Sequence, residues 1–155
     1  TSRFLTLTKG TGVINRIFHG YGKFEGEMDG RKNGALISMA TGKAVAFAIF
    51  NLQARGEMFV THNDPVYEGM IVGLTPKPGD MIINVMKGKQ LTNMRTQGTD
   101  ENVVLTPVRQ MSIAEQLSML NTDEALEITP KSLRLRKAIL NPHDRKKNEK
   151  SATPL

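Results

Sequence analysis

The chain has 155 residues, no cysteine and a formal net charge of +6 at pH 7. This length allows one well-packed core, and the lack of cysteine excludes disulfides and thiolate metal sites and fits a reducing compartment. The longest apolar run, AVAFAIF at 44–50, is only strand-sized, so we expect a soluble chain without a membrane span.

The positive charge is concentrated at one end of the chain. Residues 131–155 hold eight of the 21 lysines and arginines but two of the 15 acidic residues, whereas residues 1–130 are balanced. A basic end on a neutral body favours a polyanionic partner, because each cation that pairs with a phosphate releases condensed counterions. A frayed, solubilising tail is the alternative interpretation.

The first section, residues 4–22, alternates apolar and polar residues and ends at two glycines. We interpret it as the final strand region of a sheet and, because it begins without Met, as part of a longer protein. Residues 23–33 carry repeated glycines in polar company and are predicted to be a linker. A phosphate-binding glycine loop would need a helix after it, whereas the strand-like ALISM at 35–39 follows.

From residue 34 onward, short runs rich in Val, Ile, Phe and Met alternate with Gly, Asn, Asp or Pro. This spacing predicts an α+β fold that is predominantly β, with a curled, mainly antiparallel sheet or a barrel-like domain. The predicted strands are ALISM (35–39), KAVAFAIF (43–50), EMFV (57–60), VYEGMIVGL (66–74), MIINVM (81–86) and NVVL (102–105).

A basic segment, KGKQLTNMRTQG at 87–98, lies between the last two of these strands. It is too polar and glycine-broken for a core, so we expect a loop that is held at both ends and projects into solvent. Its cations suit a phosphate backbone, its polar side chains can hydrogen-bond, and its apolar side chains can lie against bases or riboses. The residues in these three roles are Lys87, Lys89 and Arg95; Gln90, Thr92 and Asn93; and Leu91 and Met94. The alternative is a solvated hairpin whose charges only maintain solubility.

Two helices are indicated by their first residues. Ser112 and Glu115 form an S-x-x-E capping box, and Asn141 with Pro142 is a plausible N-cap and N1 pair for a short basic helix. Helical spacing after the capping box predicts an apolar stripe that docks on the sheet. The residues of this stripe are Ile113, Leu117 and Leu120.

Two further strands are predicted at 124–129 and 132–136. In the second, side-chain alternation places Leu133 and Leu135 on one face and the arginines 134 and 136 on the other. The strand therefore has a basic face, and the residues after 147 are expected to be disordered.

No catalytic, cofactor or metal site is predicted. His19, His62 and His143 are scattered without metal-ligand spacing, and no G-x-x-x-x-G-K-[ST] motif occurs. The adjacent carboxylates Asp100 and Glu101 would point to opposite faces of a strand or into solvent. Aromatic residues make up 5% of the chain, which argues against a base-stacking sheet and favours contacts to an RNA backbone.

Four runs in the same order closely resemble the C-terminal part of the TypA/BipA family of ribosome-associated translational GTPases. They are NGALISMATGKAVAFAIFNLQARGEMFV, VYEGMIVG, KGKQLTNMRTQGTDE and LEITPKSLRLRKAIL. The resemblance implies a C-terminal fragment with four parts. These are a remnant of the elongation-factor-G-like domain V (1–22), a linker (23–33), the C-terminal domain peculiar to the family (34–147) and a disordered tail (148–155).

The same resemblance implies what the complete protein does. It would be a cytoplasmic, ribosome-stimulated GTPase that binds GTP and Mg in an N-terminal G domain absent from this sequence. Its C-terminal domain would reach large-subunit rRNA and the acceptor end of A-site tRNA through the loop at 87–98. The resemblance also implies roles in large-subunit assembly and in growth under stress. We expect a monomer without a small-molecule substrate or a membrane partner.

The candidate RNA-binding residues are therefore the loop side chains and the basic residues near the C-terminus. The full set is Lys87, Lys89, Gln90, Leu91, Thr92, Asn93, Met94, Arg95, Arg134, Arg136, Lys137, Arg145, Lys146 and Lys147. Two rival functions remain open. A protein-interaction module would recruit an assembly or signalling partner through exposed strand edges, and an enzyme would need Asp100 or Glu101 beside a histidine.

Overall fold

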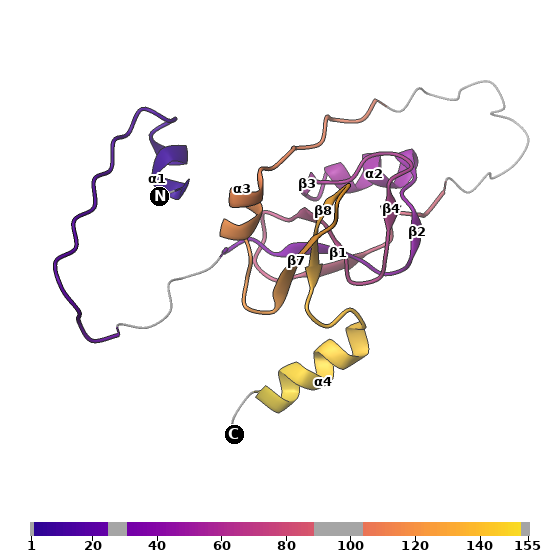
Figure 1. Cartoon of the computed structure of the whole chain (residues 1–155). Coiled ribbons are helices and arrows are strands. Elements are labelled where there is room, and N and C mark those ends of the chain that lie inside the picture. The colour runs from indigo at the N-terminus through magenta and orange to yellow at the C-terminus, as the bar shows by residue number, and fades with distance from the viewer. Residues whose placement is uncertain (1, 25–30, 89–103, 153–155) are drawn as a thin grey trace, which may run out of the picture.

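The computed structural model describes residues 2–24, 31–88 and 104–152 (Figure 1). Its centre is a four-stranded sheet in the order β3 (Glu57–Met58), β5 (Ile71–Leu74), β1 (Ala35–Ser38) and β6 (Met81–Ile83). β5 is antiparallel to both β1 and β3, whereas β6 runs parallel to β1. β3 and β6 are therefore the two edges of the sheet.

The central strands are buried on both faces, as their continuous apolar sequences suggest. Every residue of β1 and β5 is buried. Leu36 and Val72 belong to one hydrophobic cluster, whereas Ile37 and Ile71 belong to a second one. Neighbouring side chains of a strand point to opposite faces, so the sheet is the middle layer of the domain.

One face of the sheet is covered by helix α2 (Ala46–Gln53), where the sequence predicted a strand at 43–50. That prediction is wrong, because an unbroken apolar run fits a buried helix as well as a buried strand. Ala48 and Ile49 of α2 are buried, and Leu52 packs against the same cluster. The short strands β2 (Gly42–Lys43) and β4 (Pro65–Val66) pair beside it.

The other face is covered by an antiparallel hairpin of β7 (Glu124–Ile128) and β8 (Leu133–Lys137). Leu135 is buried against Ile37 and Ile71, and Leu126 packs at the margin of this cluster. Both predicted strands are confirmed. The hairpin is joined to the sheet by a bridge between Met70 and Arg136.

The segment before β1 approaches the sheet closely. A Cβ on Gly34 would collide with the carbonyl oxygen of Gly79, and the N–H of Gly34 donates to Lys77 O at 2.9 Å. Only glycine allows this approach. The chain is thereby held against the 76–80 turn immediately before β1.

The predicted start of the C-terminal helix is confirmed in α4 (Pro142–Ala152), since Asn141 Oδ1 accepts from His143 N at 2.9 Å. The capping box is confirmed in α3 (Ile113–Ser118), where Ser112 Oγ accepts from Glu115 N. The docking stripe is only partly correct. Ile113 and Leu117 are 48% and 53% exposed, whereas Leu120 packs against the second cluster and Gln116 is the buried residue of the helix.

The strand region predicted at 4–22 is wrong, because Ser2–Leu7 forms helix α1 and residues 11–24 have no regular structure. Phe4 O accepts from the hydroxyl of Thr8 at 2.9 Å, so a local contact stabilises the end of this helix. Of the predicted strand at 102–105, the described residues 104 and 105 are not in a strand, and 102 and 103 lie outside the described residues.

The predicted fold class is confirmed as α+β with β structure prominent, and the sheets formed by the described residues are open and do not close into a barrel. Within the described ranges, no helix is long and apolar enough to cross a membrane.

Candidate nucleic-acid interface

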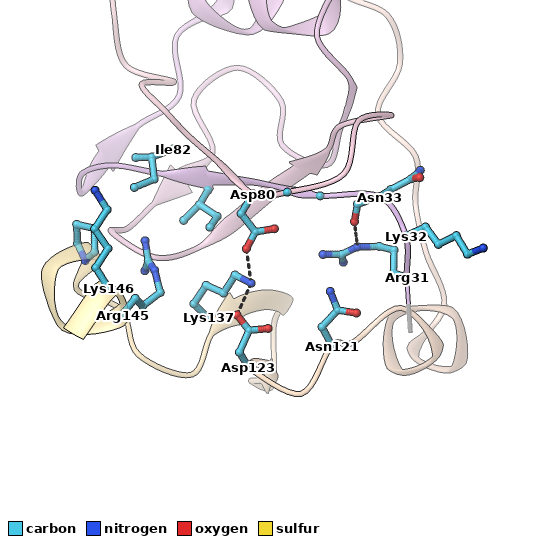
Figure 2. A pocket seen from close by; sticks show the side chains of 14 residues that line it. Arg31, Lys32, Asn33, Asp80, Ile82, Asn121, Asp123, Lys137, Arg145 and Lys146 are labelled. Carbon is cyan, nitrogen blue, oxygen red and sulfur yellow. Dashed lines mark hydrogen bonds and ion pairs between the residues drawn. The ribbon is translucent and has the colours of Figure 1, made fainter. Parts of the chain in front are cut away.

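A cavity of about 500 Å³ lies between edge strand β6, the first turns of α4 and the residues before β1 (Figure 2). Among the described residues, five cations and two carboxylates line it, so cations outnumber acids there. The cations are Arg31, Lys32, Lys137, Arg145 and Lys146, and the carboxylates are Asp80 and Asp123. These side chains come from segments far apart in the sequence, and the structure separates them into buried and exposed groups.

Lys137 belongs to the buried group and is 2% exposed. Its ammonium contacts Asp80 at 2.5 Å, Asp123 at 2.6 Å and Glu124 at 3.1 Å, as Figure 2 shows for the first two. Burial by itself lowers the pKa of Lys137, but the hydrogen bonds to Asp123 and Asp80 and the charge of Glu124 hold that pKa above its ordinary value. The ammonium stays charged inside the protein.

The prediction that Lys137 binds RNA is therefore wrong, because its ammonium is already paired with three carboxylates. The alternation of residues in LRLRK at 133–137 already indicated that Lys137 is buried. Lys137 has the same parity as Leu133 and Leu135, so it belongs to the inward face of β8 rather than the basic one.

Arg31 completes this buried group, although the sequence placed it in the linker. Its guanidinium donates to the two carboxylate oxygens of Glu124 at 2.7 and 3.2 Å and to Met119 O at 3.2 Å. The side chains of Arg31 and Glu124 are 8% and 0% exposed. A bidentate pair between a guanidinium and a carboxylate restricts the orientation of both side chains. The pair therefore holds the segment before β1 against the β7–β8 hairpin.

Asp80 connects the buried group to the central sheet. Its carboxylate accepts from the backbone N–H of Ala35 at 2.7 Å as well as from Lys137. Burial raises the pKa of Asp80, but these two hydrogen bonds outweigh burial and hold that pKa below its ordinary value. The floor of the cavity is therefore a set of ion pairs, which we call the Lys137 cluster: Arg31, Asp80, Asp123, Glu124 and Lys137.

The exposed group lies at the rim of the cavity. Lys32 and Lys146 line it and are exposed, and the next residue of α4, Lys147, is exposed as well. The side chains of these three lysines take no part in the hydrogen bonds and ion pairs among the described residues. Arg145 is half-buried and donates to Ile139 O at 3.0 Å and Leu140 O at 2.6 Å. Arg145 thus holds α4 against the chain that precedes it, while the neighbouring lysines remain available to a polyanion.

Arg134 and Arg136 lie on the opposite face of β8, as the alternation predicted. Arg134 is 3.6 Å from Glu127, and Arg136 donates to the carbonyls of residues 137 and 138 at 3.2 and 3.4 Å. Glu127 also accepts from the hydroxyl of Tyr67 at 2.6 Å. Burial, followed by this hydrogen bond, raises the pKa of Tyr67 to about 12. Both arginines are half-buried in a local polar network and do not line the cavity beside β6.

Lys87, the first residue of the predicted loop, is exposed and lines a second cavity of about 400 Å³ between α2 and β6. Ile82 of β6 is 45% exposed and lines both cavities. Lys87 at the start of the loop and Lys146 of α4 therefore flank the same edge strand. The other loop candidates, Lys89, Gln90, Leu91, Thr92, Asn93, Met94 and Arg95, lie outside the described residues.

An active site would need a carboxylate beside a histidine, and the described part of the chain does not bring the predicted residues together. His19, His62 and His143 are exposed on three separate segments, and Asp100 and Glu101 lie outside the described ranges. Among the described residues, no group of three or more His, Asp or Glu side chains could hold a metal ion.

Comparison with known proteins agrees with the resemblance seen in the sequence. Residues 33–142 match the family model of the TypA/BipA C-terminal domain. Proteins named large ribosomal subunit assembly factor BipA are 47% identical over 155 residues in Buchnera aphidicola subsp. Schizaphis graminum and 46% identical over 147 residues in Salmonella typhimurium. The namesake in Haemophilus influenzae is 42% identical over 151 residues.

These alignments cover 99%, 94% and 97% of this chain and 26%, 24% and 24% of the respective relatives. The chain thus spans about a quarter of the length of the curated relatives that it matches. The family match covers more than half of the chain, and the identities extend through nearly all of it. The chain belongs to the TypA/BipA family.

Proposed function

We propose that this chain is the RNA-contacting C-terminal module of a ribosome-associated GTPase. Its exposed cations would bind large-subunit rRNA and the acceptor end of A-site tRNA. One observation carries the proposal: Lys87 at the start of the loop and Lys146 of α4 flank the same edge strand, β6. Two basic segments about 60 residues apart can therefore contact one polyanion.

The rest of the parent protein is inferred from the family. The parent would hold GTP and Mg in an N-terminal G domain, act in the cytoplasm and assist large-subunit assembly and translation under stress. In this view the present chain does not contact GTP and contributes binding energy through contacts to the phosphates of RNA. Lys137 is buried in ion pairs, and Arg134 and Arg136 take part in a local polar network. The loop and α4 are therefore the two places where we expect that energy to arise.

The test is cosedimentation with purified large ribosomal subunits across a series of salt concentrations. Each phosphate contact to non-duplex RNA contributes about −0.7 to the slope of log K against log salt. Replacing Lys87, Lys89 and Arg95 by alanine should therefore reduce the slope by about 2 and weaken binding. Replacing Lys146 and Lys147 by alanine should reduce it by about 1.4.

Lys131→Ala is the matched control. Lys131 is an exposed lysine at the tip of the β7–β8 hairpin and lines a groove together with Phe59, next to β3 at the opposite edge of the sheet. The control should bind like the parent. Equal binding by the parent and the loop triple variant would reject the role of the loop.

A protein-interaction module is the second candidate, and the groove beside Lys131 favours it. The groove has a volume of about 810 Å³ and includes the exposed side chains of Ile113 and Ile128. Gln116 also lines it, and its buried Oε1 has no hydrogen-bond partner among the described residues. Recovery of a partner after nuclease treatment would favour this candidate, because an RNA-mediated association would be lost.

A further inference from the structure

We infer that the cavity between α2 and β6 binds one unstacked base of single-stranded RNA. The inference rests on the proposed function and adds to it a site for a base, whereas the sequence favoured contacts to the RNA backbone. The cavity has a volume of about 400 Å³, near the lower end of the roughly 300–1,000 Å³ that small-ligand sites occupy.

The walls of the cavity have the chemistry of a nucleotide site. Its apolar surface comes from Phe47 and Leu52 of α2 and from Ile82 and Ile83 of β6. Phe47 is half-buried and Ile82 is 45% exposed, so an entering base can reach both side chains. Bases that leave a stack are commonly held against aromatic and apolar side chains in this way.

Two asparagines provide complementary hydrogen-bonding groups. Asn51 Nδ2 donates to Phe47 O at 2.8 Å, which identifies the nitrogen and leaves Oδ1 as an acceptor. Asn84 Oδ1 accepts from Met86 N at 2.9 Å, which leaves its Nδ2 as a donor. Both residues are exposed and line the cavity. The polar edge of a base carries a donor next to an acceptor, so these two amides can bind it.

Arg55 and Lys87 are the charged residues that line the cavity in the described part of the chain, and both are cations. Arg55 Nη1 lies 3.8 Å from Met81 Sδ, which positions a planar guanidinium that can stack on a base. Lys87 begins the basic loop and can pair with the adjoining phosphate. Apolar walls, two free amide groups and cations without acids together favour a nucleotide over an apolar peptide.

The experiment compares two single-stranded RNA probes with the same number of phosphates, an oligoadenylate and an abasic oligomer of equal length. Binding of each to the full chain is measured by fluorescence anisotropy at one salt concentration. The parent should bind the oligoadenylate about tenfold more tightly, since only this probe carries a base that can stack in the cavity.

Three variants distinguish binding to the base from binding to the phosphate backbone. Asn51→Ala should reduce the preference for oligoadenylate, and Arg55→Lys should reduce it while keeping the charge, because lysine has no planar group to stack. Lys87→Ala should weaken binding of both probes equally. Arg109→Lys is the matched control, because Arg109 is an exposed arginine beside the other groove and should retain the full preference.

Equal binding of the two probes by the parent would overturn the base site and leave the backbone contacts of the proposed function in place. A preference that persists unchanged in both Asn51→Ala and Arg55→Lys would also overturn it. If the parent binds neither probe, the base site is rejected, and the proposed function is then decided separately by cosedimentation with large subunits.

Discussion

The Lys137 cluster and the exposed lysines of α4 are both basic in sequence, but the fold gives them opposite environments. Lys137 is 2% exposed and contacts three carboxylates, whereas Lys146, nine positions later, is exposed at the rim of the same cavity. A buried cation must be paired because removing its charge from water is costly. An exposed cation stays hydrated and does not need a partner within the protein. The positive charge of Lys137 therefore stabilises the fold, whereas the charge of Lys146 is available to attract a polyanion.

The largest expected effect comes from replacing Lys137 by methionine. The change removes the only cation of the cluster besides Arg31 and leaves the carboxylates of Asp80, Asp123 and Glu124 close together. Breaking a buried ion pair from one side costs about 3 kcal/mol of unfolding free energy. Urea denaturation followed by circular dichroism measures this loss of unfolding free energy.

Lys146→Met is the control for this comparison. Lys146 is exposed and has no ion-pair partner among the described side chains, so its replacement should change the unfolding free energy by no more than about 0.5 kcal/mol. If the two variants have the same stability, the cluster is not the internal fastening described here.

A smaller effect is expected from Asp80→Asn, and it should depend on pH. The folded-state pKa of Asp80 is lowered, so its contribution is present above the unfolded-state pKa and is lost as pH falls through the folded-state pKa. At pH 7 the variant should be less stable than the parent by about 1 kcal/mol, allowing for solvent screening of this partly exposed carboxylate. The difference should close on acidification.

Denaturant titrations of the parent and of Asp80→Asn at a series of pH values from 7 downward would check this dependence. Asp144→Asn, a change of an exposed carboxylate on α4, is the control. A stability difference between Asp80→Asn and the parent that stays constant with pH would show that the charge of Asp80 does not contribute.

The smallest effect is expected for Arg134→Ala, on the other face of the strand that carries Lys137. Arg134 and Glu127 are 3.6 Å apart, and their side chains are 28% and 32% exposed. Ion pairs this accessible to water contribute about 0.5 kcal/mol. Thermal unfolding should place this variant near the parent, and a loss as large as that of Lys137→Met would remove the contrast between the two faces of β8.

Local signals in the sequence determined much of the secondary structure. The capping box at Ser112, the Asn141 cap of α4, and the strands β1, β5, β7 and β8 were predicted because turns, caps and alternation act over a few residues. The family was also recognisable from ordered runs of residues. By contrast, α2 was predicted as a strand because an apolar run has no distinguishing period.

Only the tertiary structure decided which charges are buried and which surfaces adjoin. Arg31 and Glu124 pair across 93 positions of sequence, and the 43–53 run meets β6 to form a cavity. Neither contact has a local signature, because both depend on how distant segments pack against one sheet. The sequence by itself determined that this chain is a basic α+β module of its family. The packing decided that Lys137 stabilises the fold while Lys87 and Lys146 remain exposed along β6.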